Sequence, residues 1–170
     1  YKRQAFHALR VAGICKETDA ATSVIFDIPA ELVNDFIWRA GQHLTLRFQL
    51  QGEEVRRSYS ISSSPVSGDP LRITVKRIQD GLVSNHINDN IKVGDALEVM
   101  SPFGGFCLDP DNTARRTYYF FGAGSGITPL FSMLRSVLVA EPHSYAYLLY
   151  GNVNADSIIF REQLSHLAEQ

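Results

Sequence analysis

The segment GQHLTLRFQLQGEEVRRSYSISS (41–63) carries the clearest structural signal in the chain. In its first part, 41–50, an apolar residue stands at every second position from Leu44 to Leu50, with polar residues between them. A period of two is the pattern of a β-strand with one buried face. QGEE (51–54) is typical of a turn, and the return arm, 55–63, alternates again. The segment therefore predicts a β-hairpin.

Further strands are predicted on both sides of this hairpin. β-Branched and aromatic residues with rough alternation indicate strands from Ala5 to Thr18 and from Thr22 to Ile28, and LRITVKRI (71–78) indicates another. DALEVMSPFGGFCL (95–108) indicates a last strand, bent by its proline and glycines, after a short helix that begins at or near Ser84. About six short strands with one small helix predict a closed antiparallel barrel of the Greek-key type.

The pattern changes after this last strand. DPDNTARR (109–116) is polar and contains proline, as linkers do. The remaining chain predicts a buried strand, an amphipathic helix with Thr128 as its N-cap and Pro129 in its first turn, a second buried strand and a second helix. These segments are TYYFFGAG (117–124), TPLFSMLRSVLVA (128–140), YAYLLYGN (145–152) and SIIFREQLSHLAE (157–169). The β-α-β-α order predicts the start of a parallel, doubly wound sheet.

We therefore predict a β plus α/β protein with two domains, a barrel domain over residues 1–110 and the first part of a nucleotide-binding domain over 116–170. Two parallel strands with two helices leave a sheet with exposed edges, so we expect the second domain to be truncated. The chain also begins at Tyr1 rather than at a methionine, which suggests a piece of a longer protein.

Composition limits the class of protein. Lys and Arg number 16 and Asp and Glu number 18, a net charge of −2, so nucleic acid is not favoured as a partner. No apolar run approaches the ~18 residues of a membrane-spanning helix, and no signal peptide is recognisable, so we expect a cytoplasmic protein without a membrane partner. Cys15 and Cys107 lack CxxC spacing, so neither a zinc site nor a four-thiolate iron–sulfur cluster is expected in this chain.

RSYSISS (57–63) has residues that suit a ligand with a planar ring and a phosphate. In a strand, Arg57, Tyr59 and Ile61 share one side and the intervening serines share the other. Tyr59 offers a face for stacking, Arg57 a cation for a phosphate, and Ser60 a hydrogen bond to a ring nitrogen. The alternative is an ordinary strand with a half-buried tyrosine and a solvated arginine. Taken alone, the segment leaves both interpretations open.

Two glycine-containing segments bear on this choice. GLVS (81–84) places a glycine and free backbone amides at a helix start, where a pyrophosphate binds well, although a plain turn explains it equally. GAGSGITP (122–129) follows an apolar strand and precedes a helix, so its glycines would let the backbone approach a nucleotide. It departs from the GxGxxG fingerprint because Ile127 stands in place of the third glycine, so the geometry of that motif is not assumed.

In this order along the chain, the motifs AGQHLTL, RSYSISS, VKR, GLVS, PFGGF and GAGSGITP resemble those of the ferredoxin–NADP reductase superfamily. Within it, the chain is most similar to oxygenase reductases such as the reductase component of phenylacetyl-CoA epoxidase. In that group a flavin barrel and a nicotinamide domain precede a plant-type [2Fe-2S] domain. The resemblance covers nearly the whole chain.

The resemblance implies a binding role for each matching position. Arg57 would contact the flavin pyrophosphate, Tyr59 would stack on the isoalloxazine, and Ser60 would bond near N5, which makes Tyr59 and Ser60 the catalytic pair. The other flavin-binding residues would be Ile61, Ser63, Val75, Lys76, Gly81, Leu82, Val83 and Ser84. The nicotinamide-nucleotide loop would be Gly122, Gly124, Gly126, Thr128 and Pro129.

Departures from the family pattern concern the nucleotide and the acceptor. The family carries an arginine after GN, whereas this chain has Val153, so a 2′-phosphate loses a partner and NADH is favoured over NADPH. The family's Cys-Gly-Pro segment and any [2Fe-2S] domain would lie beyond Gln170. Neither Cys15 nor Cys107 replaces that cysteine by position.

The resulting prediction is an FAD-dependent NAD(P)H oxidoreductase that passes electrons to a one-electron acceptor, such as the [2Fe-2S] centre of an oxygenase system. One alternative is a flavin-binding electron-transfer protein without NAD(P)H activity, for which the glycine loop 122–129 would be unnecessary. The other is a non-catalytic barrel module that binds no cofactor.

Overall fold

The hairpin predicted at 41–63 is present in the computed structural model, which describes residues 5–169, as β3 (His43–Leu50) and β4 (Glu53–Ser60). The two strands pair antiparallel from His43–Ser60 to Leu50–Glu53. Both residues of the connecting turn, Gln51 and Gly52, have positive φ angles, which match the twist of a two-residue hairpin. The alternation places the side chains of Leu44 and Leu46 in the core, where they are fully buried.

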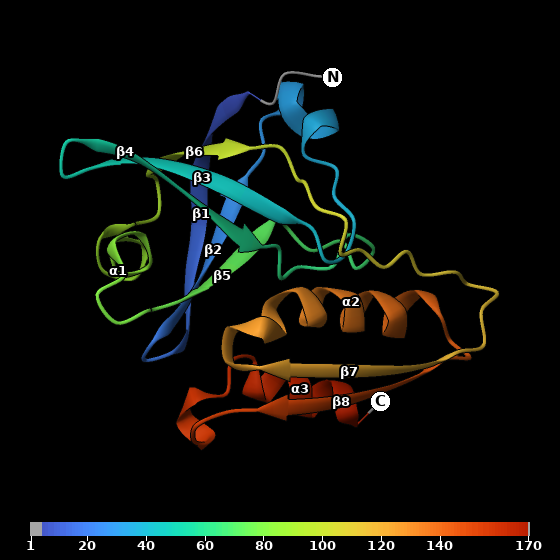
Figure 1. Cartoon of the computed structure of the whole chain (residues 1–170). Helices are drawn as coiled ribbons and strands as arrows, with labels where there is room; N and C mark the ends of the chain where they lie inside the picture. Colours follow the sequence, from blue (N-terminus) through green and yellow to red (C-terminus); the bar gives the residue numbers. More distant parts are fainter. Residues whose placement is uncertain (1–4, 170) are drawn as a thin grey trace.

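Six antiparallel strands form the predicted barrel (Figure 1). Their order is β4-β3-β6-β1-β2-β5, so β6 returns to lie between β3 and β1. The two ends of this order meet, because Ile61, just after β4, bridges Ile73, and the N–H of Ser62 donates to the carbonyl of Arg72 at 2.8 Å. The barrel strands not yet given are β1 (Phe6–Thr18), β2 (Ala21–Asp27), β5 (Arg72–Lys76) and β6 (Ala96–Met100).

Two details of the barrel differ from the prediction. Strand β6 ends at Met100 rather than 108, and the segment after it makes only isolated bridges, Phe103 with His43 and Leu108 with Ala40. Helix α1 (Leu82–Asn90) begins near Ser84, as predicted, with Gly81 in an extended conformation as its N-cap. The short helix η1 (Ala30–Asp35) was not predicted.

Helix α1 closes one end of the barrel. Val83 and Ile87 belong to the same buried cluster as the barrel strands, and the ring of His86 packs edge-on against Phe48 of β3 with centroids 5.5 Å apart. The start of α1 is therefore held against the barrel, on the side of the β3–β4 hairpin (Figure 1).

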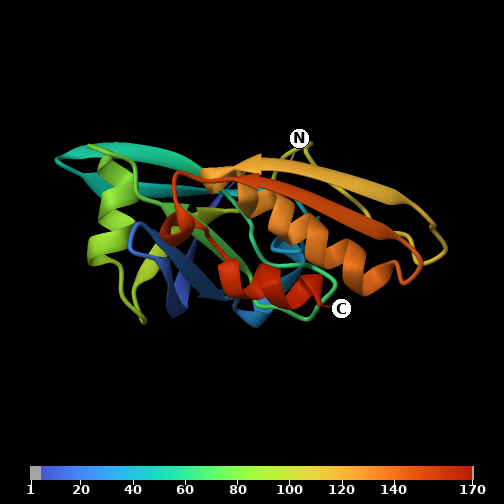
Figure 2. The same cartoon turned by 90° about the horizontal axis from the view of Figure 1, so that it is seen from below.

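The second part of the chain is the predicted β-α-β-α unit. Strands β7 (Thr117–Ala123) and β8 (Tyr145–Gly151) pair in parallel, and α2 (Ile127–Ala140) and α3 (Arg161–Ala168) lie on the same side of them (Figure 2). Short helices η2 (Gly124–Gly126) and η3 (Ala155–Ser157) follow the two strands. The other face carries exposed side chains 58–70% accessible: Tyr119, Phe121, Tyr145, Tyr147 and Leu149.

The predicted cap of the first helix of this unit is wrong. Helix α2 begins at Ile127 with Gly126 as its N-cap, and the Thr128 hydroxyl, already inside the helix, donates to the carbonyl of Ser125 at 3.0 Å. The last helix starts at Arg161, four residues later than expected, because Phe160 takes a left-handed conformation with φ +63°.

The segment 109–116 is bonded to both parts of the molecule rather than loose. Asp109 forms a two-point ion pair with Arg39 of the barrel, while the N–H of Asp111 donates to Glu141 Oε1 at 2.9 Å. Glu141 is 1% exposed and also accepts hydrogen bonds from Ser144 and Tyr118. Burial alone would raise the pKa of Glu141, but these hydrogen bonds outweigh it and hold the pKa below its usual value.

Helix α2 packs directly on the barrel. Ala21 and Ala40 of the barrel share one buried cluster with Ile127, Phe131 and other residues of the second unit. Gly41, with φ +100°, has no room for a Cβ, which would overlap the Phe106 carbonyl and Met133 of α2. This glycine lets the two parts approach closely. No helix within residues 5–169 is long and apolar enough to cross a bilayer.

Candidate functional site

The end of β4 presents Arg57 and Tyr59 on one side, as the alternation predicts. Tyr59 is paired with Leu44 and Arg57 with Leu46, while Ser60 is paired with His43 on the opposite side of the strand. Tyr59 is half-buried against the barrel core. Burial raises the pKa of Tyr59 to about 12, although the nearby Arg57 opposes the shift, so the phenol stays neutral at physiological pH.

Arg57 is an exposed cation that is available to an anion. Its Nη1 donates to the carbonyl of Arg56 at 2.7 Å, and no carboxylate of residues 5–169 pairs with it. The neighbouring Arg56 differs, because its guanidinium lies 2.6 Å from Glu54 Oε1. Of these two arginines, Arg57 is the one whose charge is left uncompensated.

Three predicted flavin-binding residues have buried side chains that a ligand cannot reach. Ile61 and Val75 are fully buried in the barrel core, and Ser63 is 1% exposed with its hydroxyl accepting the N–H of Arg72 at 3.0 Å. Closure of the barrel at Ile61 buries this part of the motif. Any contact from these three positions has to come from the main chain, and the Val75 carbonyl already accepts from Asn88 Nδ2 at 3.2 Å.

The start of α1 suits an anion. No side chain caps the first turn, which contains Leu82, Val83 and Ser84, so its backbone N–H groups carry the positive end of the helix dipole. The Ser84 hydroxyl is already engaged, because it accepts the N–H of Ile78 at 3.1 Å. A Cβ at Gly81 would come within 2.5 Å of that hydroxyl, so a glycine is required there.

The glycine loop is fixed by a residue that the sequence pattern did not indicate. Gly124 adopts φ +51°, and its carbonyl accepts a hydrogen bond from Tyr150 Oη of β8 at 2.8 Å. A Cβ at Gly122 would meet Leu130 at 2.9 Å, whereas Gly126 has open space around it. The available signal for Tyr150 was its position near the carboxyl end of a parallel strand, where ligand sites of such sheets gather.

The barrel and the glycine loop meet at Lys76. Its Nζ lies 3.4 Å from the position that a Cβ of Gly124 would take, so the end of β5 touches the loop between β7 and α2. Within the described residues, Lys76 has no carboxylate partner. Asn88 joins this strand end to the start of α1, because its Nδ2 also donates to the carbonyl of Ser84 at 2.8 Å. Lys76 and Asn88 thus connect the end of β5 to the glycine loop and to the start of α1.

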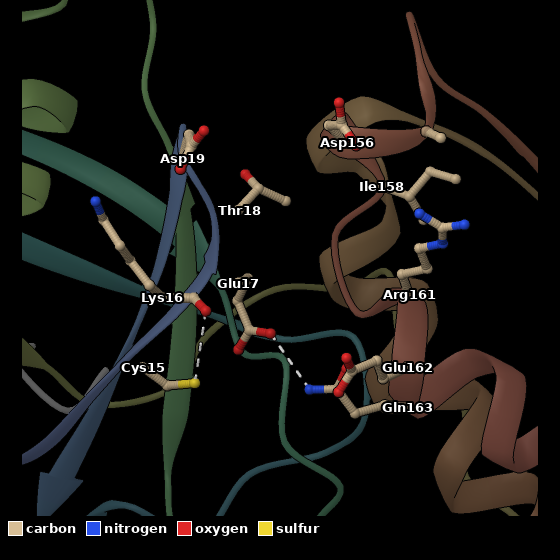
Figure 3. A pocket seen from close by; sticks show the side chains of 11 residues that line it. Cys15, Lys16, Glu17, Thr18, Asp19, Asp156, Ile158, Arg161, Glu162 and Gln163 are labelled. Atoms are coloured by element: carbon tan, nitrogen blue, oxygen red, sulfur yellow. Dashed lines mark hydrogen bonds between the residues drawn. The ribbon is translucent and has the colours of Figure 1, made fainter.

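A separate hollow of about 530 Å³ lies between the β1–β2 turn and α3 (Figure 3). Gln163 Nε2 donates to Glu17 Oε2 at 3.3 Å across it. Its lining has charges of both signs, including Lys16, Asp156 and Arg161, and it contains none of the predicted site residues. We therefore place the candidate site at the Lys76–Gly124 junction, where the Lys76 ammonium lies against the glycine loop, and not in this hollow.

Comparison with known families matches both parts of the chain. The family described as "Oxidoreductase FAD-binding domain" matches residues 16–107, more than half of the chain, and the one described as "Oxidoreductase NAD-binding domain" matches residues 120–170. The two matches leave 108–119 between them, which includes the predicted linker.

Individual relatives give the same picture. The chain is 39% identical over 165 residues to the E component of the 1,2-phenylacetyl-CoA epoxidase of Escherichia coli (strain K12), and the match covers 97% of this chain and 46% of that protein. It is 42% identical over 166 residues to the ferredoxin reductase component of the 3-ketosteroid-9-alpha-monooxygenase of Rhodococcus rhodochrous, a match that covers 95% and 45%. The chain therefore spans less than half the length of these relatives.

Solved structures share the arrangement of both units. The flavohem-like FAD/NAD binding domain of nitric oxide dioxygenase from Vibrio cholerae O1 biovar El Tor superposes with a TM-score of 0.82 at 26% identity, covering 99% of this chain and 71% of that one. Phthalate dioxygenase reductase, described as modular for electron transfer from pyridine nucleotides to [2Fe-2S], gives 0.77 at 28% identity, covering 94% and 48%.

Proposed function

Since the chain belongs to the family of oxidoreductases with an FAD-binding domain, we propose that it binds FAD on the barrel and NAD(P)H at the glycine loop, and that it passes electrons from the nucleotide to the flavin. The observation that carries this proposal is the approach of Lys76 to Gly124, because it brings the two binding surfaces together at one point.

The residues around this junction fit FAD. Arg57 and the uncapped first turn of α1 supply a cation and backbone N–H groups for a pyrophosphate. Tyr59 supplies a neutral aromatic face, which suits stacking on a planar ring, and Ser60 is the next residue of β4, on the opposite side of the strand. Tyr59 would orient the ring, and Ser60 would hydrogen-bond at the position of N5.

FAD, when bound, supplies an acceptor for a hydride and can return the electrons one at a time. The chain's own contribution is binding and orientation, and none of the proposed site residues needs to act as a strong acid or base. Gly122, Gly124 and Gly126, with Thr128 and Pro129 at the helix start, would let the backbone approach the nicotinamide nucleotide, and the Tyr150 hydroxyl holds that loop in shape.

NADH is the proposed nucleotide. Val153, which follows β8 at the position where the family resemblance implies an arginine, is 90% exposed and cannot pair with a 2′-phosphate. A cation introduced here is expected to shift the preference towards NADPH.

The proposed electron acceptor is an iron–sulfur centre or an oxygenase component. Similar chains are named as reductase components of monooxygenases, and the name of phthalate dioxygenase reductase refers to [2Fe-2S]. Such a centre would belong to a part that this chain does not contain.

We also propose a reducing compartment, the cytoplasm, because Cys15 and Cys107 are both unpaired.

The visible spectrum of the FAD-loaded protein, before and after anaerobic addition of NADH, tests the proposal. We expect a yellow protein that bleaches with NADH, and weaker FAD retention in Tyr59→Ala. A yellow protein that stays yellow would favour an electron-transfer protein without NAD(P)H activity. A colourless protein that takes up no added FAD would favour a barrel that acts only as an interaction module.

A further inference from the structure

Four buried serines connect the segment that follows β4, which we call the flavin strand, to helix α2, which follows the glycine loop. We call these four residues the serine seam: Ser63, Ser64, Ser132 and Ser136. Ser132 Oγ donates to the carbonyl oxygen of Ser63 at 2.6 Å, and the hydroxyl oxygens of Ser64 and Ser136 are 2.8 Å apart. Ser136 Oγ also lies 2.7 Å from the Ser132 carbonyl. All four residues are at most 1% exposed.

The seam is close to both proposed binding surfaces. Ser63 comes three residues after Ser60 at the end of β4, and Ser132 comes four residues, about one helical turn or ~6 Å, after Thr128 of the nucleotide loop. A shift of α2 along its axis would therefore move the glycine loop relative to the flavin strand by a similar distance. The hydroxyl bonds oppose such a shift.

Apolar packing alone would not fix this position. The cluster of Ala40, Ile127 and Phe131 holds α2 on the barrel, but apolar contact has no preferred direction. Hydrogen bonds require defined distances and angles, and breaking one in a buried setting leaves a polar group without a partner. An ion pair beside the seam also opposes a shift of α2 along the barrel. Arg135 Nη1 of α2 lies 2.5 Å from Asp69 Oδ2 of the barrel.

We infer that Ser132 and Ser136 are positioning residues for hydride transfer: through the serine seam they set the distance between the bound nicotinamide and the flavin ring. The inference rests on the proposed function. Ser132 meets the proposed flavin-binding residues only at the carbonyl oxygen of Ser63, and Ser136 bonds Ser64, which is not one of them. Their main effect is therefore expected on the geometry of the reacting pair rather than on FAD binding.

The test compares Ser132→Ala and Ser136→Ala with Ser165→Ala, a matched control. Ser165 also bonds a carbonyl one turn earlier in its helix, that of Arg161, but it is exposed and has no contact with the barrel. We expect both seam variants to retain FAD affinity within about twofold. Misplacement of reacting groups is costly, so we expect the limiting rate of anaerobic flavin reduction by NADH to fall about tenfold or more. The control stays at the wild-type rate.

A second readout separates positioning from a general loss of stability. Stacking of nicotinamide on flavin gives a long-wavelength charge-transfer absorbance, which we expect to weaken in the seam variants at saturating NADH. Reduction rate and charge-transfer absorbance that both match the wild type would overturn the inference. A loss of FAD affinity as large as the loss of rate would also overturn it, because that pattern indicates general destabilisation.

The fluorescence of the single tryptophan reports on the seam in the protein without cofactor. Trp38 Nε1 donates to the same Ser63 carbonyl as Ser132, at 3.3 Å. We expect its emission maximum in the FAD-free protein to move in Ser132→Ala and not in Ser165→Ala, and an unmoved maximum contradicts the seam itself. A wild type that is never reduced by NADH contradicts the proposed function instead. Should Ser132→Ala fail to fold, Asp69→Asn breaks the adjoining ion pair at a partly exposed site, and an unchanged reduction rate there overturns the inference.

Discussion

The two halves of the hydroxyl-rich run RRSYSISSS (56–64) differ in what their polar groups contact. In the first half, Arg57 is exposed and its charge is unpaired among the described residues, while the Ser58 hydroxyl lies on the outer surface, 2.9 Å from that of Thr45. In the second half, Ser62, Ser63 and Ser64 are buried, and every hydroxyl has a partner within the protein.

The difference begins at Ile61, where the barrel closes. Before that residue the strand has a free side that a ligand can use, and after it the chain lies between the barrel and α2. Similar residues in one continuous motif therefore have different tasks: the first half is proposed to bind, and the second half holds the protein together. Burial separates the two tasks, not residue type.

The largest expected effect concerns the open half. Arg57→Ala removes the cation proposed for the pyrophosphate, and a hydrogen bond to a charged group contributes about 1.5–3 kcal/mol, so FAD affinity should fall about tenfold to a hundredfold. Titration of the FAD-free protein with FAD, followed by flavin fluorescence, measures this. Arg56→Ala is the matched control, because Arg56 pairs with Glu54. Equal losses in both variants would show that general surface charge, and not Arg57, attracts the cofactor.

A substitution in the buried half should lower the free energy of unfolding and leave FAD binding unchanged. Ser62 Oγ is 2.8 Å from Thr74 Oγ1, which is in turn 2.7 Å from Ser23 Oγ, so Ser62→Ala interrupts a buried chain of hydroxyls. We expect the free energy of unfolding to decrease by about 1–2 kcal/mol, with FAD affinity unchanged. Urea denaturation of the FAD-free protein measures the change. Exposed Ser58→Ala should cost less than about 0.5 kcal/mol, and a variant of Ser62 that loses FAD affinity at full stability would remove the distinction between the halves.

The last expected effect appears only at high pH and concerns Tyr59, whose phenol is half-buried between the two environments. Its pKa is raised to about 12 from 10.0, so between these values the folded protein keeps a proton that the unfolded chain releases. The free energy of unfolding should therefore fall as pH rises from 10 towards 12, with no contribution below pH 10. Tyr59→Phe should lessen this fall in denaturation experiments across the range. An identical slope in the wild type and in Tyr59→Phe would refute the burial argument.

The sequence predicts the periodic elements of the fold well. Alternation at 41–63 predicts the hairpin and the sides of Arg57 and Tyr59, because period and register follow from local pattern. It does not predict that Ile61, Ser63 and Val75 have buried side chains, since their burial depends on closure of the barrel against a distant strand. The wrong cap at Thr128 has a different, local reason: Gly126 is the N-cap, and the helix already begins at Ile127.

Two polar residues of structural importance were also missed. Tyr150 and Glu141 lie in segments whose local pattern indicates only a strand and a helix end, and their partners, Gly124 and Asp111, are 26 and 30 residues away. The local pattern does not reveal such long-range partners, and the position of Tyr150 near the carboxyl end of a parallel strand is the one signal available for it. The proposed binding residues themselves were found through motif resemblance, and the structure adds the meeting of Lys76 and Gly124.

The segment between the two units acts as a brace, not a hinge. Asp109 is tied to the barrel through Arg39, Asp111 is tied to the second unit through Glu141, and only Pro110, whose φ angle is fixed by its ring, lies between them. Rotation of one unit against the other would have to break either the Arg39–Asp109 ion pair or the hydrogen bond from Asp111 to Glu141. We therefore expect the distance between the two proposed binding surfaces to be nearly the same with and without bound nucleotide. Nucleotides would then bind and dissociate without a closing motion of the two units.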